Sequence, residues 1–176
     1  MNVPANLKYT KDHEWIKVEG SNAVIGVTDF AQGQLGDVVF IEIETQGETL
    51  AKEEVFGTIE AVKTVSDMFM PVGGEIIEVN PKLVDSPDVV NKDPYGDGWM
   101  VKIKITNPAE LSELLTPEQY KELINAYDVW QQKSFMGKKY MGIVRTTFII
   151  DEKGKIAHIF ENVKVANHTE EVLEKQ

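Results

Sequence analysis

The sequence contains no cysteine. Without a thiol the chain cannot form disulfides, thiolate metal sites or a cysteine nucleophile. Its three histidines, His13, His158 and His168, lie far apart and lack the spacing of metal ligands, so no metal site is expected. No apolar run reaches the about 18 residues of a membrane span, and the first 15 residues lack the apolar core of a secretory signal. These absences predict a cytoplasmic protein.

Positive charge is scarce in the first 126 residues, which hold 10 Lys and Arg against 22 Asp and Glu, a net of −12. The remaining fifty residues hold 8 against 7, a net of +1, which together gives the formal charge of −11. An acidic body of this kind disfavours binding to nucleic acid and to anionic membranes. The composition therefore predicts partners with basic docking surfaces, unless the charge serves solubility alone.

Short β-branched runs dominate the first 107 residues and predict an antiparallel sandwich or barrel. The predicted strands cover residues 23–28, 38–44, 55–62, 65–70, 75–79 and 100–105. Residues 29–36 suggest a short helical turn. Residues 80–98, rich in Pro, Asp, Asn and Gly, predict a long surface loop.

Two helices are expected next, a short one over residues 108–115 and a second over 114–126. Thr116, Pro117 and Gln119 fit the N-cap, first and third positions of the second helix, which is a capping-box pattern. The sequence thus predicts a sheet-rich domain that ends in a capped helix.

The pattern changes after residue 126. Residues 127–140 are mixed and predict irregular structure, whereas 143–150 and 155–161 predict two strands joined by the turn 151–154. A short helix is expected after Asn167. A hairpin and one helix would be marginally stable alone, so we expect residues 127–176 to pack on the first domain or on a second copy of themselves.

Lys63 is the one basic residue between Lys52 and Lys82, and it lies between two predicted strands. A type I turn over residues 62–65 needs no glycine and would expose Lys63 at the tip of a hairpin. An exposed lysine is poorly suited to be a Schiff-base nucleophile, which requires desolvation, but it is well suited to modification by another enzyme. Glu60 and Asp67 flank it as acidic marks for a recognising enzyme. The alternative is an ordinary solvated turn.

Several motifs, in order, resemble the H protein of the glycine cleavage system, a lipoyl carrier. They are KYTKDHEW, IGVTDFAQGQLGDVVFIE, GTIEAVKTVSDMFMPVGGEIIEVN, DPYGDGWMVKIK and LLTPEQYKELI. The resemblance covers residues 1–126, and it implies a mainly β fold, a hybrid barrel-sandwich with a C-terminal helix.

The resemblance also implies a function. Lys63 stands where the family attaches lipoic acid through an amide. The arm would carry an aminomethyl group from a pyridoxal-phosphate glycine decarboxylase to a tetrahydrofolate-dependent aminomethyltransferase, and dihydrolipoamide dehydrogenase would reoxidise it. A lipoate ligase or a lipoyl/octanoyl transferase would attach it. Glu14 and Asp67 match family positions near the arm, where either could pair with the cationic amine; otherwise Glu14 serves the fold and Asp67 ends the turn.

Residues 127–176 are similar to the C-terminal part of a Q-type peroxiredoxin, which has a thioredoxin-like fold. The runs YDVWQQKSFMGKKYMGIVRTTFIIDEKGKIAHIF and VKVANHTEEVLE carry this resemblance. It implies that Arg145 occupies the position of an arginine that organises the peroxide site. Because the chain has no cysteine, peroxidase activity is excluded.

The two resemblances meet near residue 126 and suggest a chimera, natural or engineered. The leading interpretation is a lipoyl carrier with an inactive appended fragment, possible as a homo-oligomer through residues 127–176. The alternatives are a chimera whose tail governs folding or assembly, and a biotin-type carrier. A biotin carrier normally has methionines beside its lysine, and here the neighbours are Val62 and Thr64.

Overall fold

The computed structural model describes residues 1–126, 130–135, 138–143, 147–150 and 156–160. The chain divides into two compact units, Met1–Lys121 and Glu122–Gln176. Within the described part of the chain, no helix is long and apolar enough to cross a membrane.

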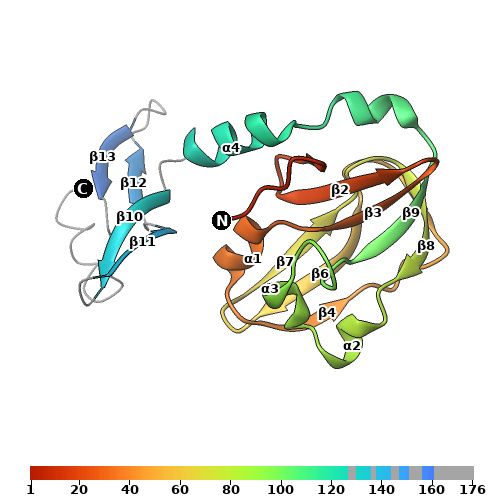
Figure 1. Cartoon of the computed structure of the whole chain (residues 1–176), viewed down its shortest axis with the longest axis horizontal. Helices are drawn as coiled ribbons and strands as arrows, with labels where there is room; N and C mark the ends of the chain where they lie inside the picture. The colour runs from red at the N-terminus through yellow and green to blue at the C-terminus, as the bar shows by residue number, and fades with distance from the viewer. Residues whose placement is uncertain (127–129, 136–137, 144–146, 151–155, 161–176) are drawn as a thin grey trace. The chain divides into compact units, whose positions relative to one another are not determined.

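The first unit contains two antiparallel sheets (Figure 1). The larger sheet has the strand order β1 (Lys8–Tyr9), β2 (Glu14–Glu19), β3 (Asn22–Val27), β9 (Val101–Ile105), β8 (Gly74–Val79) and β5 (Thr49–Leu50). The smaller sheet has the order β4 (Val38–Glu42), β6 (Val55–Ala61) and β7 (Thr64–Phe69). The prediction of a mainly β, antiparallel fold is therefore confirmed.

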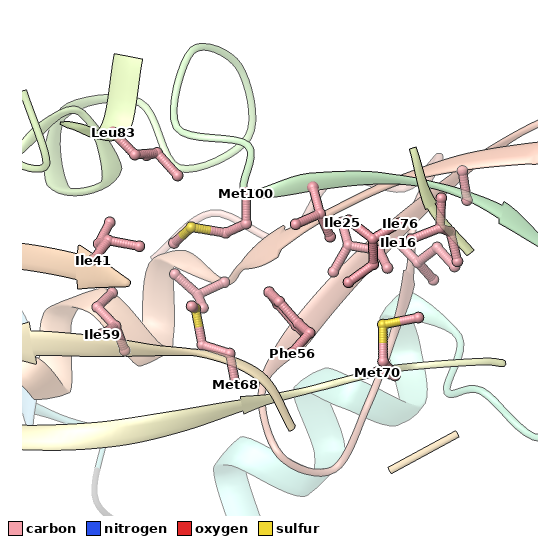
Figure 2. Close-up of a cluster of buried hydrophobic side chains, with 14 of the residues drawn as sticks. Ile16, Ile25, Ile41, Phe56, Ile59, Met68, Met70, Ile76, Leu83 and Met100 are labelled. Atoms are coloured by element: carbon pink, nitrogen blue, oxygen red, sulfur yellow. The ribbon is translucent and has the colours of Figure 1, made fainter. Parts of the chain in front are cut away.

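Apolar side chains from both sheets face one another and form one core (Figure 2). Ile16, Ile25 and Ile76 come from the larger sheet and meet Phe56 and Met68 from the smaller one. In the smaller sheet the preceding residues Val55 and Asp67 are exposed, as expected for a sheet that covers one side of a core. In the larger sheet Trp15 and Gly26, the neighbours of Ile16 and Ile25, are buried as well.

The helices of the described chain are short. They are α1 (Asp29–Leu35), α2 (Lys82–Asp85), α3 (Val89–Lys92), the 3-10 helix η1 (Pro108–Ser112) and α4 (Pro117–Ala126). The predicted capping box of α4 is confirmed: the Gln119 N–H donates to the Thr116 hydroxyl at 3.3 Å, and the Thr116 N–H donates to the Gln119 side chain at 2.9 Å.

Several expectations for the first unit need correction. The segment 80–98 was expected to be a surface loop, but it contains the single-turn helices α2 and α3, whose Leu83 and Val90 are buried. Single turns leave no helical periodicity to detect. The strands β1, β2 and β5 were not predicted. The strand after Trp99 begins at Val101 rather than at residue 100.

After the end of α4, the described residues of the second unit form two antiparallel strand pairs. β10 (Trp130–Phe135) pairs with β11 (Lys138–Ile143), so the prediction of irregular structure was wrong over residues 130–135 and 138–140. β12 (Thr147–Ile150) pairs with β13 (Ile156–Phe160), which confirms the predicted hairpin. Of the strand expected over 143–150, Ile143 belongs to β11 and Thr147–Ile150 form β12, whereas residues 144–146 lie outside the described residues. The expected helix after Asn167 lies outside the described residues.

Candidate functional site

Lys63 lies in the two-residue turn between β6 and β7. Ala61 pairs with Thr64, so Val62 and Lys63 are the two central residues and the turn begins one residue earlier than predicted. Among the described non-glycine residues, positive φ angles occur at His13 and Glu53, so neither central residue has one. This excludes the primed turns that usually close such hairpins and is compatible with the expected type I turn.

The turn is anchored from one side by the segment before β4. The Val62 N–H donates to the Asp37 carbonyl at 3.1 Å, which extends the β4–β6 ladder to the turn. The side chain of Asn91 in α3 fixes the residues on either side of Asp37: its Oδ1 accepts from the Val38 N–H at 2.9 Å, and its Nδ2 donates to the Gly36 carbonyl at 2.9 Å. Asn91 therefore supports the Lys63 turn indirectly: it fixes Gly36 and Val38, and Asp37 between them accepts from the Val62 N–H.

The turn is exposed although it carries apolar side chains. Val62 and Val65 are 70% and 61% exposed, and Lys63 is exposed between them. Among the described residues, none forms a hydrogen bond or an ion pair with the Lys63 ammonium. The Lys63 amine is therefore accessible from solvent.

Glu60 and Asp67 share the outer face of the three-stranded sheet. Glu60 pairs with Val65, and Asp67 pairs with Thr58 two residues further along, so the four side chains point to the same side. Both acids are exposed. The structure thus brings two of the predicted site residues to one face beside Lys63.

Glu14 lies at the opposite end of β7 from Lys63. Its side chain is 2% exposed, and its Oε1 accepts from the Phe69 N–H at 3.1 Å. The Thr10 hydroxyl donates to Oε2, and the Glu14 N–H donates back to the Thr10 oxygen at 3.0 Å. Burial raises the pKa of Glu14, and the hydrogen bonds from Thr10 and Phe69 oppose this rise. Glu14 joins β2 of one sheet to β7 of the other.

Glu14 also lines a pocket of about 190 Å³. The charged side chains around it are four acids and two lysines, which leaves an acidic excess. Lys11 pairs with Glu53, and Lys52 pairs with Glu113. The fourth acid is Asp12, and the uncharged lining residues are Tyr9, Thr10, Phe69, Met70, Pro71, Leu114 and Leu115. Such a pocket suits a small ligand with an apolar part and a positive charge.

A buried polar cluster stands beside Glu14. The His13 Nδ1 and the Tyr120 hydroxyl lie 3.0 Å apart, and the Tyr120 hydroxyl lies 2.8 Å from that of Thr28. The Tyr9 and Tyr120 rings are stacked with centroids 4.6 Å apart. Burial lowers the pKa of His13, with Asp12 acting in the opposite direction. The cluster holds the start of α4 against β1 and the N-cap of α1.

The predicted site residues therefore fall into two groups. Glu60, Lys63 and Asp67 lie together on one hairpin. Glu14, which belongs to β2, contacts that hairpin at Phe69, six residues beyond Lys63 and about 20 Å away at the rise of an extended strand. Arg145 lies outside the described residues. Sequence reasoning missed Asn91, because residues 80–98 were expected to be a loop. The one available signal was an asparagine directly after the apolar pair Val89 and Val90.

Among the described residues, no group of three or more histidine or acidic side chains could hold a metal ion.

Comparison with known proteins gives a consistent match over the first unit. The sequence profile of the glycine cleavage H-protein family matches residues 7–127. The glycine cleavage system H protein of Bacteroides fragilis is 59% identical over 126 residues, which cover 72% of this chain and 100% of that protein. That of Chlorobium limicola is 60% identical over 126 residues, 70% of this chain and 98% of that protein.

A solved structure agrees. The crystal structure of a glycine cleavage system H protein from Mycobacterium marinum matches with a TM-score of 0.64 and 38% identity, and the match covers 70% of this chain and 99% of that one. Profile, relatives and structure thus coincide on the unit that carries the Lys63 hairpin. Over residues 7–127, the chain belongs to the family of glycine cleavage H-proteins.

Proposed function

We propose that Lys63 is the residue to which lipoic acid is attached. As an H protein, the chain is the lipoyl carrier of the glycine cleavage system and is not itself catalytic. Proteins of this family carry lipoic acid on a lysine. The observation that carries the proposal is the position of Lys63 at an exposed two-residue turn without a described partner.

The other lysines of residues 1–126 are less suitable. Seven of the ten bind a backbone carbonyl or a carboxylate: Lys8, Lys11, Lys17, Lys52, Lys82, Lys92 and Lys102. Of the remaining three, Lys104 lies in β9 between two neighbouring strands and Lys121 lies in α4. Of these three, only Lys63 stands on a turn, where an enzyme can reach the amine from several directions.

Attachment needs an activated acyl donor, which a lipoate ligase makes from lipoic acid and ATP. An amide forms between the Lys63 Nζ and the lipoyl carbonyl carbon. The bond from that carbon to the phosphate oxygen of the acyl-adenylate breaks, AMP leaves, and the ammonium gives up two protons. A lipoyl/octanoyl transferase would supply the acyl group from a thioester instead. The exposed turn fits either enzyme, because no described side chain must move to release the amine.

The dithiolane of a bound lipoyl group supplies the chemistry, by accepting an aminomethyl group as it is reduced. The residues of this chain display that group to the enzymes of the system. We propose as partners a pyridoxal-phosphate glycine decarboxylase, a tetrahydrofolate-dependent aminomethyltransferase and dihydrolipoamide dehydrogenase. The net charge of −11 favours basic docking surfaces on these enzymes. A cytoplasmic location is part of the same proposal.

We assign different roles to the three acidic residues. Glu60 and Asp67, which are exposed on the outer face of the hairpin, are recognition marks for the modifying enzyme. Asp67 is also the acidic residue of β7, the strand that follows Lys63, and can contact the lipoyl arm. Glu14 acts through the pocket that it lines. A carboxylate has about four lone-pair positions, so Glu14 can accept from a cationic amine in addition to Thr10 and Phe69.

Intact-mass measurement tests the assignment of Lys63. The full chain is incubated with a lipoate ligase, lipoic acid and ATP. The wild type and Lys104→Arg should each gain the mass of one lipoyl group, and Lys63→Arg should gain none. An adduct on Lys63→Arg, or no adduct on the folded wild type, would refute the assignment.

Residues 127–176 are proposed to be a peroxiredoxin-like fragment that makes the chain a chimera. Two observations support this. The Bacteroides fragilis relative is covered over its full length by 126 residues of this chain, so the last fifty extend beyond it. The hairpin of β12 and β13 agrees with the pattern that carries the resemblance. The chain holds no cysteine, so the fragment is inactive as a peroxidase and Arg145 is a remnant.

The appended residues are further proposed to cover their strand edges, by packing on the first unit or by joining two copies of the chain. The solution mass of the full chain and its limited proteolysis test this. Slow cleavage after residue 130, or a dimeric mass, is the expected result. A strictly monomeric mass together with rapid loss of the residues after 130 would contradict it.

A further inference from the structure

β7 is an open edge beside Lys63. The strand order β4–β6–β7 leaves one long side of β7 without a neighbouring strand among the described residues. The four residues from Thr64 to Asp67 are all exposed. The open edge therefore begins at the residue directly after Lys63.

The direction of the backbone groups on this edge follows from the hydrogen bonds at its far end. The Phe69 N–H donates to Glu14 on the larger sheet, and the next N–H, of Met70, donates to the Glu54 carbonyl on the β6 side. Backbone groups alternate in direction along an antiparallel strand. The N–H and C=O groups of Val65 and Asp67 therefore point away from β6, to the same side as the N–H of Phe69.

These outward groups have little to satisfy them within the described chain. The Thr64 hydroxyl donates weakly to the Val65 carbonyl at 3.3 Å. Edge strands normally carry a bulge, a proline or an inward charge that prevents pairing with another chain. The other edge strand, β4, has an irregularity between Val38 and Phe40, whereas the pairing of β7 with β6 is regular from Thr64 to Met68.

We propose that the enzyme that acylates Lys63 adds one of its own extended segments to the edge of β7, pairing with the backbone of Val65 and Asp67. This inference rests on the assignment of Lys63 as the acylated residue. Strand addition fixes position and direction through backbone hydrogen bonds, so a lysine at the end of the paired strand enters the active site at a set depth. The enzyme therefore need not recognise the Lys63 side chain itself.

The outer face of the sheet specifies the side chains of that segment. Val65, Glu60 and the 53% exposed Phe40 form one row across the three strands, and Asp67, Thr58 and Glu42 form the next. A segment paired with β7 would place an apolar side chain beside Val65 and a basic one beside Asp67. A second copy of this chain is a poorer occupant, because the first 126 residues carry a net charge of −12.

Steady-state kinetics with a lipoate ligase, lipoic acid and ATP test the backbone contact. Val65→Pro removes the outward N–H, whereas Val65→Ala removes the same side chain and keeps the N–H. We expect kcat/KM for acylation to fall about tenfold further in Val65→Pro than in Val65→Ala. Equal values in the two variants would overturn the proposal.

A second pair of variants tests the position of the partner. Asp67→Lys and Glu42→Lys make the same charge change on the same face, at the open edge and two strands away from it. Pairing at the edge predicts the larger loss of kcat/KM for Asp67→Lys. Equal losses would indicate docking on the whole face and would contradict strand addition.

Amide hydrogen exchange of the wild-type chain covers the case in which Val65→Pro does not fold. Saturating ligase should slow exchange at Val65 and Asp67 while the Ser66 amide changes little. Unchanged exchange at Val65 and Asp67 would overturn the proposal. Exchange that slows in the absence of ligase, and slows further as the chain concentration rises, would also overturn it and would assign the edge to a second copy. Failure of the Lys63 assignment is distinguishable, since the wild type would then gain no lipoyl group.

Discussion

The Glu14 carboxylate accepts a hydrogen bond from the backbone N–H of Phe69 at 3.1 Å and so joins the two sheets. Glu14→Ala should lower the free energy of unfolding by about 1–3 kcal/mol, because the half-buried Phe69 N–H then lacks an acceptor. Glu14→Gln should retain most of the stability, since its amide oxygen can accept from the same N–H. Denaturant unfolding at pH 7 measures both, and an Ala variant as stable as the Gln variant would contradict this account.

The same carboxylate should affect the pH dependence of stability. Burial raises the pKa of Glu14 above its ordinary value of 4.5. Between 4.5 and the raised value the folded state holds the proton and the unfolded state does not, so this group reduces stability as pH rises through that window. Glu14→Gln should therefore gain stability relative to the wild type between pH 4.5 and pH 7. A constant difference across that range would show that the two states share one pKa.

His13 should act in the opposite direction. Burial lowers the pKa of His13 below its ordinary value of 6.5. As pH falls below 6.5, the unfolded state therefore binds a proton at His13 before the folded state does. The His13 contribution is present above pH 6.5 and is lost as pH falls. Its φ of 78° suits asparagine, so His13→Asn keeps the backbone and removes the titration. Unfolding curves from pH 7 to pH 5 should show a smaller loss in this variant; an unchanged slope would exclude His13 as the cause.

Asn91 should control the order of the Lys63 turn. Asn91→Ala leaves the Val38 N–H and the Gly36 carbonyl without their side-chain partner, and we expect a loss of about 1–3 kcal/mol. The Val62 amide, bonded to Asp37, should also exchange faster. Asn107→Ala, which removes a bond on the surface, is the control and should change stability by less than about 0.5 kcal/mol. Matching effects in the two variants would rule out the supporting role of Asn91.

Gly26 should be intolerant of a side chain. It pairs directly with Trp15, and a Cβ at this position would lie 2.7 Å from carbons of the indole ring. Gly26→Ala should displace Trp15, weaken the bond from its Nε1 to the Pro94 carbonyl, and cost about 1–3 kcal/mol. Gly33→Ala in α1 meets nothing within 4 Å and should be stabilising by about 0.5–1 kcal/mol. Thermal unfolding with tryptophan fluorescence compares the two, and similar shifts in both would be inconsistent with the contact.

Local features of the fold were predictable from the sequence. The Lys63 hairpin follows from β-branched runs on both sides, and the α4 cap follows from Thr116 and Gln119, whose bonds span three residues. The turn was placed one residue late, because its register depends on the distant Asp37 carbonyl as well as on the turn sequence.

The relations between distant residues were not predictable. Glu14 and Asp67 were expected near the same arm, but the sequence does not show that β2 meets β7 at Phe69. Asn91 lies in a single helical turn, and its partners at Gly36 and Val38 are more than fifty residues away. Patterns along the chain record which face of an element is buried, whereas they carry no record of which element covers it.

The two anchors of the Lys63 hairpin set how far a group joined to that lysine can travel. The Asp37 carbonyl holds the turn and the Glu14 carboxylate holds the far end of β7, so the backbone beneath Lys63 has little freedom of its own. A tethered group then samples a volume fixed by the length of its tether. An enzyme docked beside the hairpin would meet that group at a high effective concentration whatever the concentration of the carrier in solution.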